Sequence, residues 1–541
     1  MAPLPLLAPL LDACFRGKHR TLFHKMFVLI LTFFVYTSYH QSRRPISIAK
    51  GRWYRNCSIP INDHLFPIFN ASDAGNKSMY WCDWTPFDTG DAEFLLGWLD
   101  TGYLFAYAVG MFFSGHIAER MSLRYFLTGG MLLSGFFTAA MGLAQFLNIH
   151  QYSFFITTMV IGGLFQATGW PAVVAVVANW FGKGRRGFIM GVWNTHTSLG
   201  NIVGALIAGI FINDVWAWSF IVPGLIIAGM GVLVFLLLIE YPSDIQCESP
   251  EVPGAESNSS VNFSDDESAG QLRGTLPSEK PAISIWRALM IPGVVEYSLA
   301  LFFCKLVSYT FLFWLPFYIT STTSLSDSQS ADFSTLFDVG GVMGGIVIGL
   351  MSDISGASAT VSFIALLISA PMVYIYNAFN GISFGAGIGL MMLTAFFTNA
   401  PYALITTAVS ADLGTHPCLH GNAKALAVVS AIIDGTGTIG AAIGPLLTGI
   451  INPSSPKGWN YVFLMLSGAE LLSALCLVRL VYKDIRLQFC KTDYQLISSG
   501  SREDDGAIRT ETRSIKNSSK EQTTKPPNER RRKTCVRSVV A

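Results

Sequence analysis

The chain has 541 residues, of which 51% are hydrophobic and 13% are charged, and its formal net charge at pH 7 is +1. This composition is typical of a protein that crosses a membrane many times, and it nearly excludes a soluble globular protein. The expected surroundings are a lipid bilayer, and no nucleic-acid partner is expected.

Two sets of six apolar stretches are long enough to cross a bilayer, which takes about 20 mostly apolar residues per helix. In the first set the predicted helices cover roughly residues 24–48, 93–116, 125–147, 153–178, 187–211 and 215–239. In the second set they cover roughly residues 293–320, 331–353, 359–377, 383–410, 424–450 and 458–482. The sequence therefore predicts an all-α polytopic membrane protein with two six-helix halves, residues 24–240 and 289–484.

The segments outside these halves are polar. Residues 241–288 are rich in Ser, Glu, Asp, Pro and Gly. Such a segment cannot bury enough apolar area to fold, so it is predicted to be a disordered linker. Residues 485–541 are predicted to be a disordered tail, and residues 1–23 form a short segment before the first helix.

Lysines and arginines at the helix ends predict the orientation, because cationic flanks stay in the cytoplasm. They gather before the first helix and after the second, fourth and last helices, for example at Lys18, Arg120, Lys183 and Lys483. Both termini and the linker are therefore predicted to be cytoplasmic. The loop at 51–91 then faces the lumen or the outside, and its glycosylation sequons lie at Asn56, Asn70 and Asn76.

Cys57 and Cys82 lie in that first loop. In an oxidising compartment they could close the loop with a disulfide, and two free thiols are an equally weighted alternative. The spacing of the cysteines does not indicate a zinc or iron–sulfur site, so no metal and no cofactor are predicted.

A glycine pattern repeats between the fifth helix of each half. Gly200, Gly204 and Gly209 have the same spacing as Gly440, Gly444 and Gly449. Small residues four apart allow membrane helices to approach closely, so these glycines indicate packing rather than substrate binding. The repeat nevertheless supports two equivalent halves, which usually hold their substrate between them near the middle of the membrane.

The loop after the second helix reads Gly115-His-Ile-Ala-Glu119-Arg120-Met-Ser-Leu-Arg124. It resembles the Gly-x-x-x-Asp-Arg-x-Gly-x-Arg motif of the major facilitator superfamily, with Glu for Asp and Ser122 for Gly. Within that superfamily the chain resembles the organophosphate:phosphate antiporters, most closely the animal sugar-phosphate exchangers of the endoplasmic reticulum. The segments that carry this resemblance are Tyr39-His-Gln-Ser-Arg43-Arg44-Pro45, Gln166-Ala-Thr-Gly169-Trp170-Pro171, Asn179-Trp180-Phe181-Gly182-Lys183, Lys305-Leu-Val-Ser-Tyr309 and Asp434-Gly435-Thr436-Gly437.

This resemblance covers essentially all of the predicted membrane helices. It implies the major facilitator fold and an antiporter, not an enzyme. The exchanged substrates would be a sugar phosphate, glucose 6-phosphate first, and inorganic phosphate. It also implies residence in the endoplasmic reticulum membrane, while the oligomeric state is left open.

Three cations are candidates to bind the phosphate group, because a compact anion in a poorly hydrated cavity needs charges that keep their protons. Arg43 and Arg44 lie in the second half of helix 1, and Lys305 lies midway along helix 7. The resemblance assigns Arg43 to the phosphate. The alternatives are that Arg43 reaches the membrane boundary, and that Lys305 only pairs with an internal carboxylate such as Asp100 or Asp434.

The chain departs from the bacterial antiporters at three positions. Their second phosphate-binding arginine corresponds to Ser308, with Lys305 one turn earlier on nearly the same helix face. Their helix-4 histidine corresponds to Asn179, and their helix-5 histidine corresponds to Thr197, beside His196. These changes put proton coupling of the bacterial type in doubt.

The predicted lining of the sugar site consists of polar and aromatic side chains inside the helices: Trp170, Asn179, Asn194, His196, Tyr309 and Asp434. The alternative for each of them is a role in helix packing or in a hydrogen bond between helices. Asp100 and Asp338 are further carboxylates within helices, and they are predicted to balance the charge of the cations when the site is empty.

Exchange is the leading hypothesis, because an empty cavity with uncompensated positive charge is costly to seal from water. A proton-coupled carrier of another organic anion, with Asp100 or Asp434 as the protonated group, is the alternative. A membrane-embedded enzyme is disfavoured because the helices show isolated reactive side chains without partners. A transporter-like receptor is disfavoured because it would not need buried cations.

Overall fold

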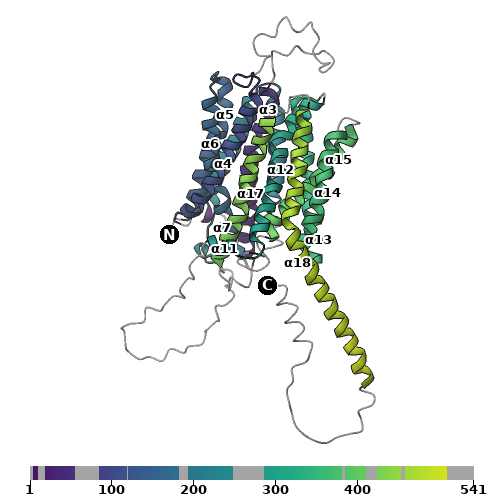
Figure 1. Cartoon of the computed structure of the whole chain (residues 1–541). Coiled ribbons are helices and arrows are strands. Elements are labelled where there is room, and N and C mark those ends of the chain that lie inside the picture. The colour runs from purple at the N-terminus through teal and green to yellow at the C-terminus, as the bar shows by residue number, and fades with distance from the viewer. Residues whose placement is uncertain are drawn as a thin grey trace, which may run out of the picture.

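The computed structural model is a bundle of long helices that run side by side (Figure 1). It describes residues 4–9, 12, 19–54, 84–118, 120–181, 193–247, 285–323, 325–379, 384–409, 413, 423–451 and 457–508. Within these ranges, 11 helices are long and apolar enough to cross a membrane, and one shorter apolar helix, His196–Ile212, accompanies them. Every predicted span therefore corresponds to a helix.

The N-terminal half contains the first six spans. Its helices are α2 (Arg20–Arg43), α3 (Pro45–Trp53), α4 (Ala92–Ala118), α5 (Leu123–Phe146), α6 (Tyr152–Gln166), α7 (Gly169–Phe181), α9 (His196–Ile212) and α10 (Ala217–Leu237). The first span consists of α2 and α3, which meet at Arg44 and Pro45. Because proline has no backbone N–H, it ends one helix and is well suited to begin the next. This break lies at the two arginines that the sequence singles out.

The C-terminal half contains the other six spans. Its helices are α11 (Ile285–Leu289), α12 (Val294–Thr322), α13 (Asp327–Ser355), α14 (Ser358–Phe379), α15 (Phe384–Leu404) with the π-helical turn η3 (Ile405–Val409), α17 (Ala423–Ile451) and α18 (Gly458–Ile508). The short α11 is the exception, since it precedes the first span of this half. Ser326 caps α13 by accepting a hydrogen bond from the backbone N–H of Gln329, at 3.3 Å.

The repeated glycines pack each half in the same way. A Cβ atom at Gly204 would meet α2 at Gln41 and Arg44, and one at Gly444 would meet α12 at Leu306 and Thr310. The fifth helix of each half therefore lies directly on the first helix of that half. Gly209 of the N-terminal half faces Ala331 of the C-terminal half, and Gly449 of the C-terminal half faces Glu93 of the N-terminal half. These contacts confirm that the glycines serve packing and show that the two halves are equivalent.

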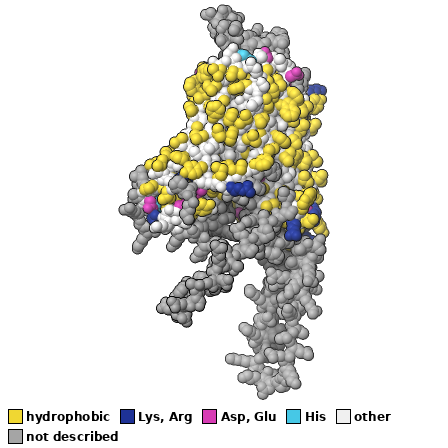
Figure 2. All heavy atoms as spheres, turned by 90° about the vertical axis from the view of Figure 1, so that its left-hand side faces the viewer, with side chains coloured by type: hydrophobic (Ala, Val, Ile, Leu, Met, Phe, Trp, Pro, Cys, Tyr) yellow, Lys and Arg dark blue, Asp and Glu magenta, His cyan; other side chains and the backbone are white. Residues whose placement is uncertain are grey.

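Hydrophobic side chains cover the outer surface of the bundle as a broad band (Figure 2). Large apolar residues point outward along most of the helices, for example Phe105 on α4, Phe136 on α5, Ile210 on α9 and Leu475 on α18. In the view of Figure 2, charged side chains lie at the margins of this band rather than within it. This distribution is the one that a hydrocarbon environment requires.

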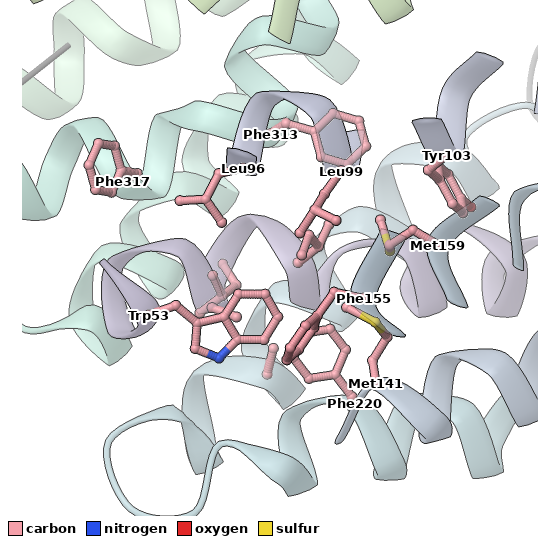
Figure 3. Packing of buried hydrophobic residues seen from close by; sticks show 14 of the residues in the cluster. Trp53, Leu96, Leu99, Tyr103, Met141, Phe155, Met159, Phe220, Phe313 and Phe317 are labelled. Atoms are coloured by element: carbon pink, nitrogen blue, oxygen red, sulfur yellow. The ribbon is translucent and has the colours of Figure 1, made fainter. Parts of the chain in front are cut away.

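One buried apolar cluster is shared by the two halves. It joins Trp53, Leu96 and Phe155 of the N-terminal half to Phe313 and Phe317 of α12 (Figure 3). We call the end of the bundle where Trp53 lies the α3 face, at the top of Figure 1, and the other end the opposite face. The two clusters that contain Val28 and Ala288 lie toward the opposite face, and each stays within one half. Among the described residues, the halves therefore close on each other at the α3 face.

The structure changes the predicted boundaries of the polar segments. Helix α18 continues to Ile508, so residues 485–508 are helical where a disordered tail is predicted. A helix that has begun gains one backbone hydrogen bond for each added residue, which sequence polarity does not reveal. The linker is also ordered at both ends, in η2 (Pro242–Ile245) and in α11. Asn56, Cys57, Asn70, Asn76 and Cys82, together with residues 248–284 and 509–541, lie outside the described residues.

Candidate functional site

Arg43 is a buried cation without a counter-charge in the described part of the chain. It ends α2 and is 5% exposed. Its Nε has no hydrogen-bond partner, and its guanidinium lies over the ring of Tyr107, 5.7 Å from the centroid. A charged group buried in this way is costly unless something pairs with it. The arrangement therefore calls for an anion next to Arg43.

Tyrosine side chains surround this arginine. Tyr36, Tyr103, Tyr107 and Tyr309 all lie within electrostatic reach of the Arg43 guanidinium. The first three come from the N-terminal half, whereas Tyr309 comes from α12 of the C-terminal half. The two halves thus meet around Arg43 with phenol groups that can donate or accept hydrogen bonds.

Histidine and tryptophan rings extend the site on the side of α9. His196 is fully buried, and its ring centroid lies 4.7 Å from that of Tyr36 and 4.2 Å from that of Trp193. His40 lies 5.8 Å from His196, and Trp170 lies 5.3 Å from Tyr36. The predicted Trp170 and His196 therefore both pack on Tyr36, which lies within electrostatic reach of Arg43.

Arg43 also lines a small cavity inside the N-terminal half. Ser42, Tyr103 and Gln166 are among its lining residues. The Tyr103 hydroxyl and the Gln166 Oε1 are buried there without a hydrogen-bond partner. Polar atoms of this kind usually bind water, so this cavity is suited to hold solvent behind the arginine.

Lys305 is held by a carboxylate. Its Nζ lies 2.7 Å from Oδ1 of Asp434 on α17, and the exposed fractions of the two side chains are 5% and 25%. The lysine also lies over the ring of Tyr402, 5.7 Å from the centroid. Asp434 and Arg43 both lie within electrostatic reach of Tyr107. Arg43 of the N-terminal half and the Lys305–Asp434 pair of the C-terminal half therefore approach the same tyrosine, Tyr107.

Arg44 points to the C-terminal half instead of the site. Its guanidinium donates to the backbone oxygen of Leu312 and, at 3.0 Å, to Oγ of Ser334. It also lies 3.9 Å from Asp338, whose other oxygen accepts a hydrogen bond of 3.1 Å from Asn201. These contacts place Arg44 and Asp338 in the closure between the halves. Of the three candidate cations, only Arg44 lies close enough to Asp338 to balance its charge.

Asp100 pairs with a cation that the sequence reading did not include. It accepts a hydrogen bond from Nζ of Lys50 on α3, and both side chains are 0% exposed. The predicted partners, Arg43 and Lys305, do not reach it. Position along the chain could not show this pairing, because Lys50 lies between the predicted first helix and the polar loop, at the edge of that loop.

Two predicted residues of the sugar site have other neighbours. Asn179 donates to the backbone oxygen of Glu240 at 3.2 Å, so its amide holds the segment that follows α10. The Glu240 carboxylate in turn accepts from the backbone N–H of Leu123 at 3.0 Å, at the start of α5. Asn194 lies in the turn before α9, where its backbone oxygen accepts from Thr197. These contacts give Asn179 a structural role at the opposite face.

The sequence reading missed Tyr36, His40 and Tyr107 as site residues. A helical signal could have found the first two, because Tyr36, His40 and Arg43 follow one another at i, i+4 and i+7 on one face of α2. Tyr107 has no such signal, since it lies on α4, which packs on α6 and α17, and only the tertiary structure brings its ring to the arginine.

A search against protein-family models matches residues 83–416 to the Major Facilitator Superfamily. Among curated proteins, the mouse glucose-6-phosphate exchanger SLC37A2 is 50% identical, with 88% of this chain and 93% of the relative covered. The human glucose-6-phosphate exchanger SLC37A2 is 51% identical over 87% of this chain and 95% of the relative. The mouse glucose-6-phosphate exchanger SLC37A1 is 46% identical over 86% of this chain and 94% of the relative.

Solved structures resemble this chain in fold. A bacterial homologue of the human lysosomal transporter Spinster, in an inward-facing and unoccupied conformation, has a TM-score of 0.58 with 16% identity. The match covers 86% of this chain and 96% of that one. A D-xylose–proton symporter has a TM-score of 0.58 with 12% identity and covers 84% of this chain and 98% of its own.

Proposed function

Because this chain belongs to the Major Facilitator Superfamily and, within it, to the family of the glucose-6-phosphate exchangers, we propose that it exchanges glucose 6-phosphate for inorganic phosphate. The chain is a multi-pass membrane transporter, not an enzyme. The relatives carry the sugar phosphate in their names, and the inorganic counter-substrate is our inference from the site. We also propose the endoplasmic reticulum as its membrane, with both termini in the cytoplasm and the α3 face toward the lumen.

The uncompensated charge of Arg43 is the observation that carries this proposal. A phosphate monoester brings about two negative charges and three acceptor oxygens, and the planar guanidinium can bond two of those oxygens at once. Among the described residues, no carboxylate lies within ion-pair distance of Arg43. The ligand itself then supplies the missing charge.

Lys305 is the second proposed phosphate ligand, and Asp434 is its competitor. In the empty site Asp434 offsets the lysine charge at 2.7 Å. A phosphate group that approaches Arg43 would draw the ammonium toward itself and weaken this pair. Substrate and Asp434 thus share one cation, which keeps binding weak enough for release on the far side of the membrane.

The sugar part would lie against the tyrosines. Tyr107 and Tyr309 lie within electrostatic reach of both Arg43 and Lys305, Tyr36 lies within reach of Arg43, and the ring of Tyr402 lies under Lys305. Trp170 and His196 stand one ring farther out on the α9 side. Aromatic faces and hydroxyls are the groups that recognise a sugar ring, so this wall would distinguish a sugar phosphate from phosphate alone.

Exchange follows from the contacts that close the α3 face. To open this face, Arg44 has to leave Leu312, Ser334 and Asp338. Rocking of the two halves would break these contacts and form others at the opposite face. During the passage the site is sealed from water, and an unfilled Arg43 would then be a buried unpaired charge. Only a loaded carrier would therefore cross readily, which produces exchange instead of net flow.

The test is efflux of labelled phosphate from proteoliposomes that contain the purified chain. We expect rapid efflux with external glucose 6-phosphate or external phosphate, and slow efflux into buffer alone. Equal efflux in both conditions would refute obligatory exchange. Uptake driven by an imposed pH gradient in the absence of phosphate would instead support the proton-coupled alternative.

A further inference from the structure

Lys50 and Asp100 form the most deeply buried ion pair of the described residues, and the proposed cycle leaves it without a role. Both residues belong to the N-terminal half, on α3 and α4. The pair lies on the α3 side of Arg43, since Lys50 follows Arg43 by seven residues (50 − 43) on the same span. Seven residues correspond to about 10 Å along a helix.

The cover over Lys50 comes from the other half. Its Nζ lies 4.1 Å from the ring centroid of Trp314 and 5.8 Å from that of Phe313, both on α12. Trp314 is itself 1% exposed and belongs to the apolar cluster that both halves share. Figure 3 shows Phe313 beside Leu99, one residue before Asp100. The pair is thus internal to one half, while its lid belongs to the half that has to move away.

We propose that Lys50 is a transit site for the phosphate group on the α3 face, uncovered when Trp314 withdraws and held at low affinity by Asp100. This inference rests on the proposed exchange function. An ammonium has three donors, of which one is directed to Asp100 here. When the halves separate, the donors that face the rings become available to phosphate oxygens.

The carboxylate explains why such a site would pass an anion on. An unpaired lysine in a narrow vestibule would retain a phosphate dianion, whereas conduction along a path needs sites that bind and then release. The Lys50 donors would hold the anion in the vestibule, and Asp100 offsets the lysine charge, so the anion is bound weakly and moves on to Arg43, which has no carboxylate partner in the described chain.

A purely structural brace is the competing explanation, and sided exchange kinetics separate the two. The chain is reconstituted in one orientation, checked by protease cleavage of the part of α18 that extends beyond the bundle (Figure 1). Inorganic phosphate is then titrated separately on each face. The main variant is Lys50→Gln with Asp100→Asn, which removes both charges and preserves shape, so that no single charge stays buried.

For this double variant we expect the apparent KM for phosphate on the α3 face to rise about tenfold, because the charged Lys50 donors that would bond the phosphate oxygens are lost. The KM on the opposite face should stay within about twofold. Asp100→Asn alone should lower the KM on the α3 face, because Lys50 is then uncompensated. Neutralising the Arg479 and Glu296 pair, whose atoms lie 2.6 Å apart on the opposite face, is the matched control and should leave the α3 face unchanged.

Equal KM changes on both faces, or no change on either face, would overturn the transit site and leave a structural brace. That result is distinguishable from failure of the proposed function, in which the unmodified chain itself shows no exchange. If the double variant does not fold, Asp100→Asn alone distinguishes the two explanations. A transit site predicts that this variant binds phosphate more tightly on the α3 face, whereas a structural brace predicts no tighter binding.

Discussion

Substituting Arg43 should abolish exchange and leave the fold intact, whereas substituting its neighbour Arg44 should damage the fold. Arg43 makes no ion pair within the described chain, so Arg43→Ala leaves no partner unsatisfied. Arg44 bonds Leu312 and Ser334 and lies beside Asp338. Arg44→Ala therefore leaves buried acceptors without a donor at the closure between the halves.

The expected magnitudes follow from these contacts. A hydrogen bond to a charged group contributes about 1.5–3 kcal/mol, and a guanidinium fork makes two of them to phosphate. Arg43→Lys keeps the charge and loses one bond, so phosphate affinity should fall about 10- to 100-fold. Arg43→Ala loses both bonds and the charge, so exchange should be undetectable. Arg44→Ala should lose on the order of 3 kcal/mol of stability, because it breaks a buried charged contact.

The assay combines phosphate exchange in proteoliposomes with thermal unfolding of the purified variants in detergent. We expect Arg43→Ala to unfold at the temperature of the unmodified chain or slightly above it, because a costly buried charge is removed. Arg44→Ala should unfold at a clearly lower temperature. Exchange by Arg43→Ala with an unchanged KM would refute the role of this residue. Equal destabilisation by both variants would refute the assignment of Arg44 alone to the closure.

Four other substitutions test the rest of the site and the packing. Asp434→Asn should bind phosphate several-fold more tightly and exchange it more slowly, because phosphate no longer competes with a carboxylate for Lys305. A higher KM for phosphate in this variant would contradict the competition. Asp338→Asn should speed opening of the α3 face, which faster labelling of a cysteine placed beside Trp314 would reveal, and unchanged labelling would argue against the closure. Gly204→Ala and Gly444→Ala should each cost about 1–3 kcal/mol in thermal unfolding, since the added Cβ lies closer than 3.0 Å to the neighbouring helix. Gly129→Ala and Gly468→Ala, where a Cβ meets nothing within 4 Å, should be neutral and serve as controls.

The sequence by itself determined the helices, their number in each half and the duplication. Apolar length sets a membrane span, because each backbone polar group in hydrocarbon must be satisfied within its own helix. The glycine spacing also reported a real contact, since Gly204 and Gly444 each lie against the first helix of their half. Arg43 was a candidate as a cation inside an apolar span, but only the family resemblance assigned it to the phosphate.

Only the tertiary structure decided which charges pair and which stay available. Arg43 and Arg44 are adjacent in sequence, yet one lies over Tyr107 and the other beside Asp338, because successive residues of a helix point about 100° apart. Asp100 forms an ion pair with Lys50, a residue that the sequence places at the edge of a polar loop. Ion pairs depend on the rotation and depth of helices that are far apart in the chain. Apolar periodicity does not encode this rotation and depth, so only the packing of the two halves determines which charges pair.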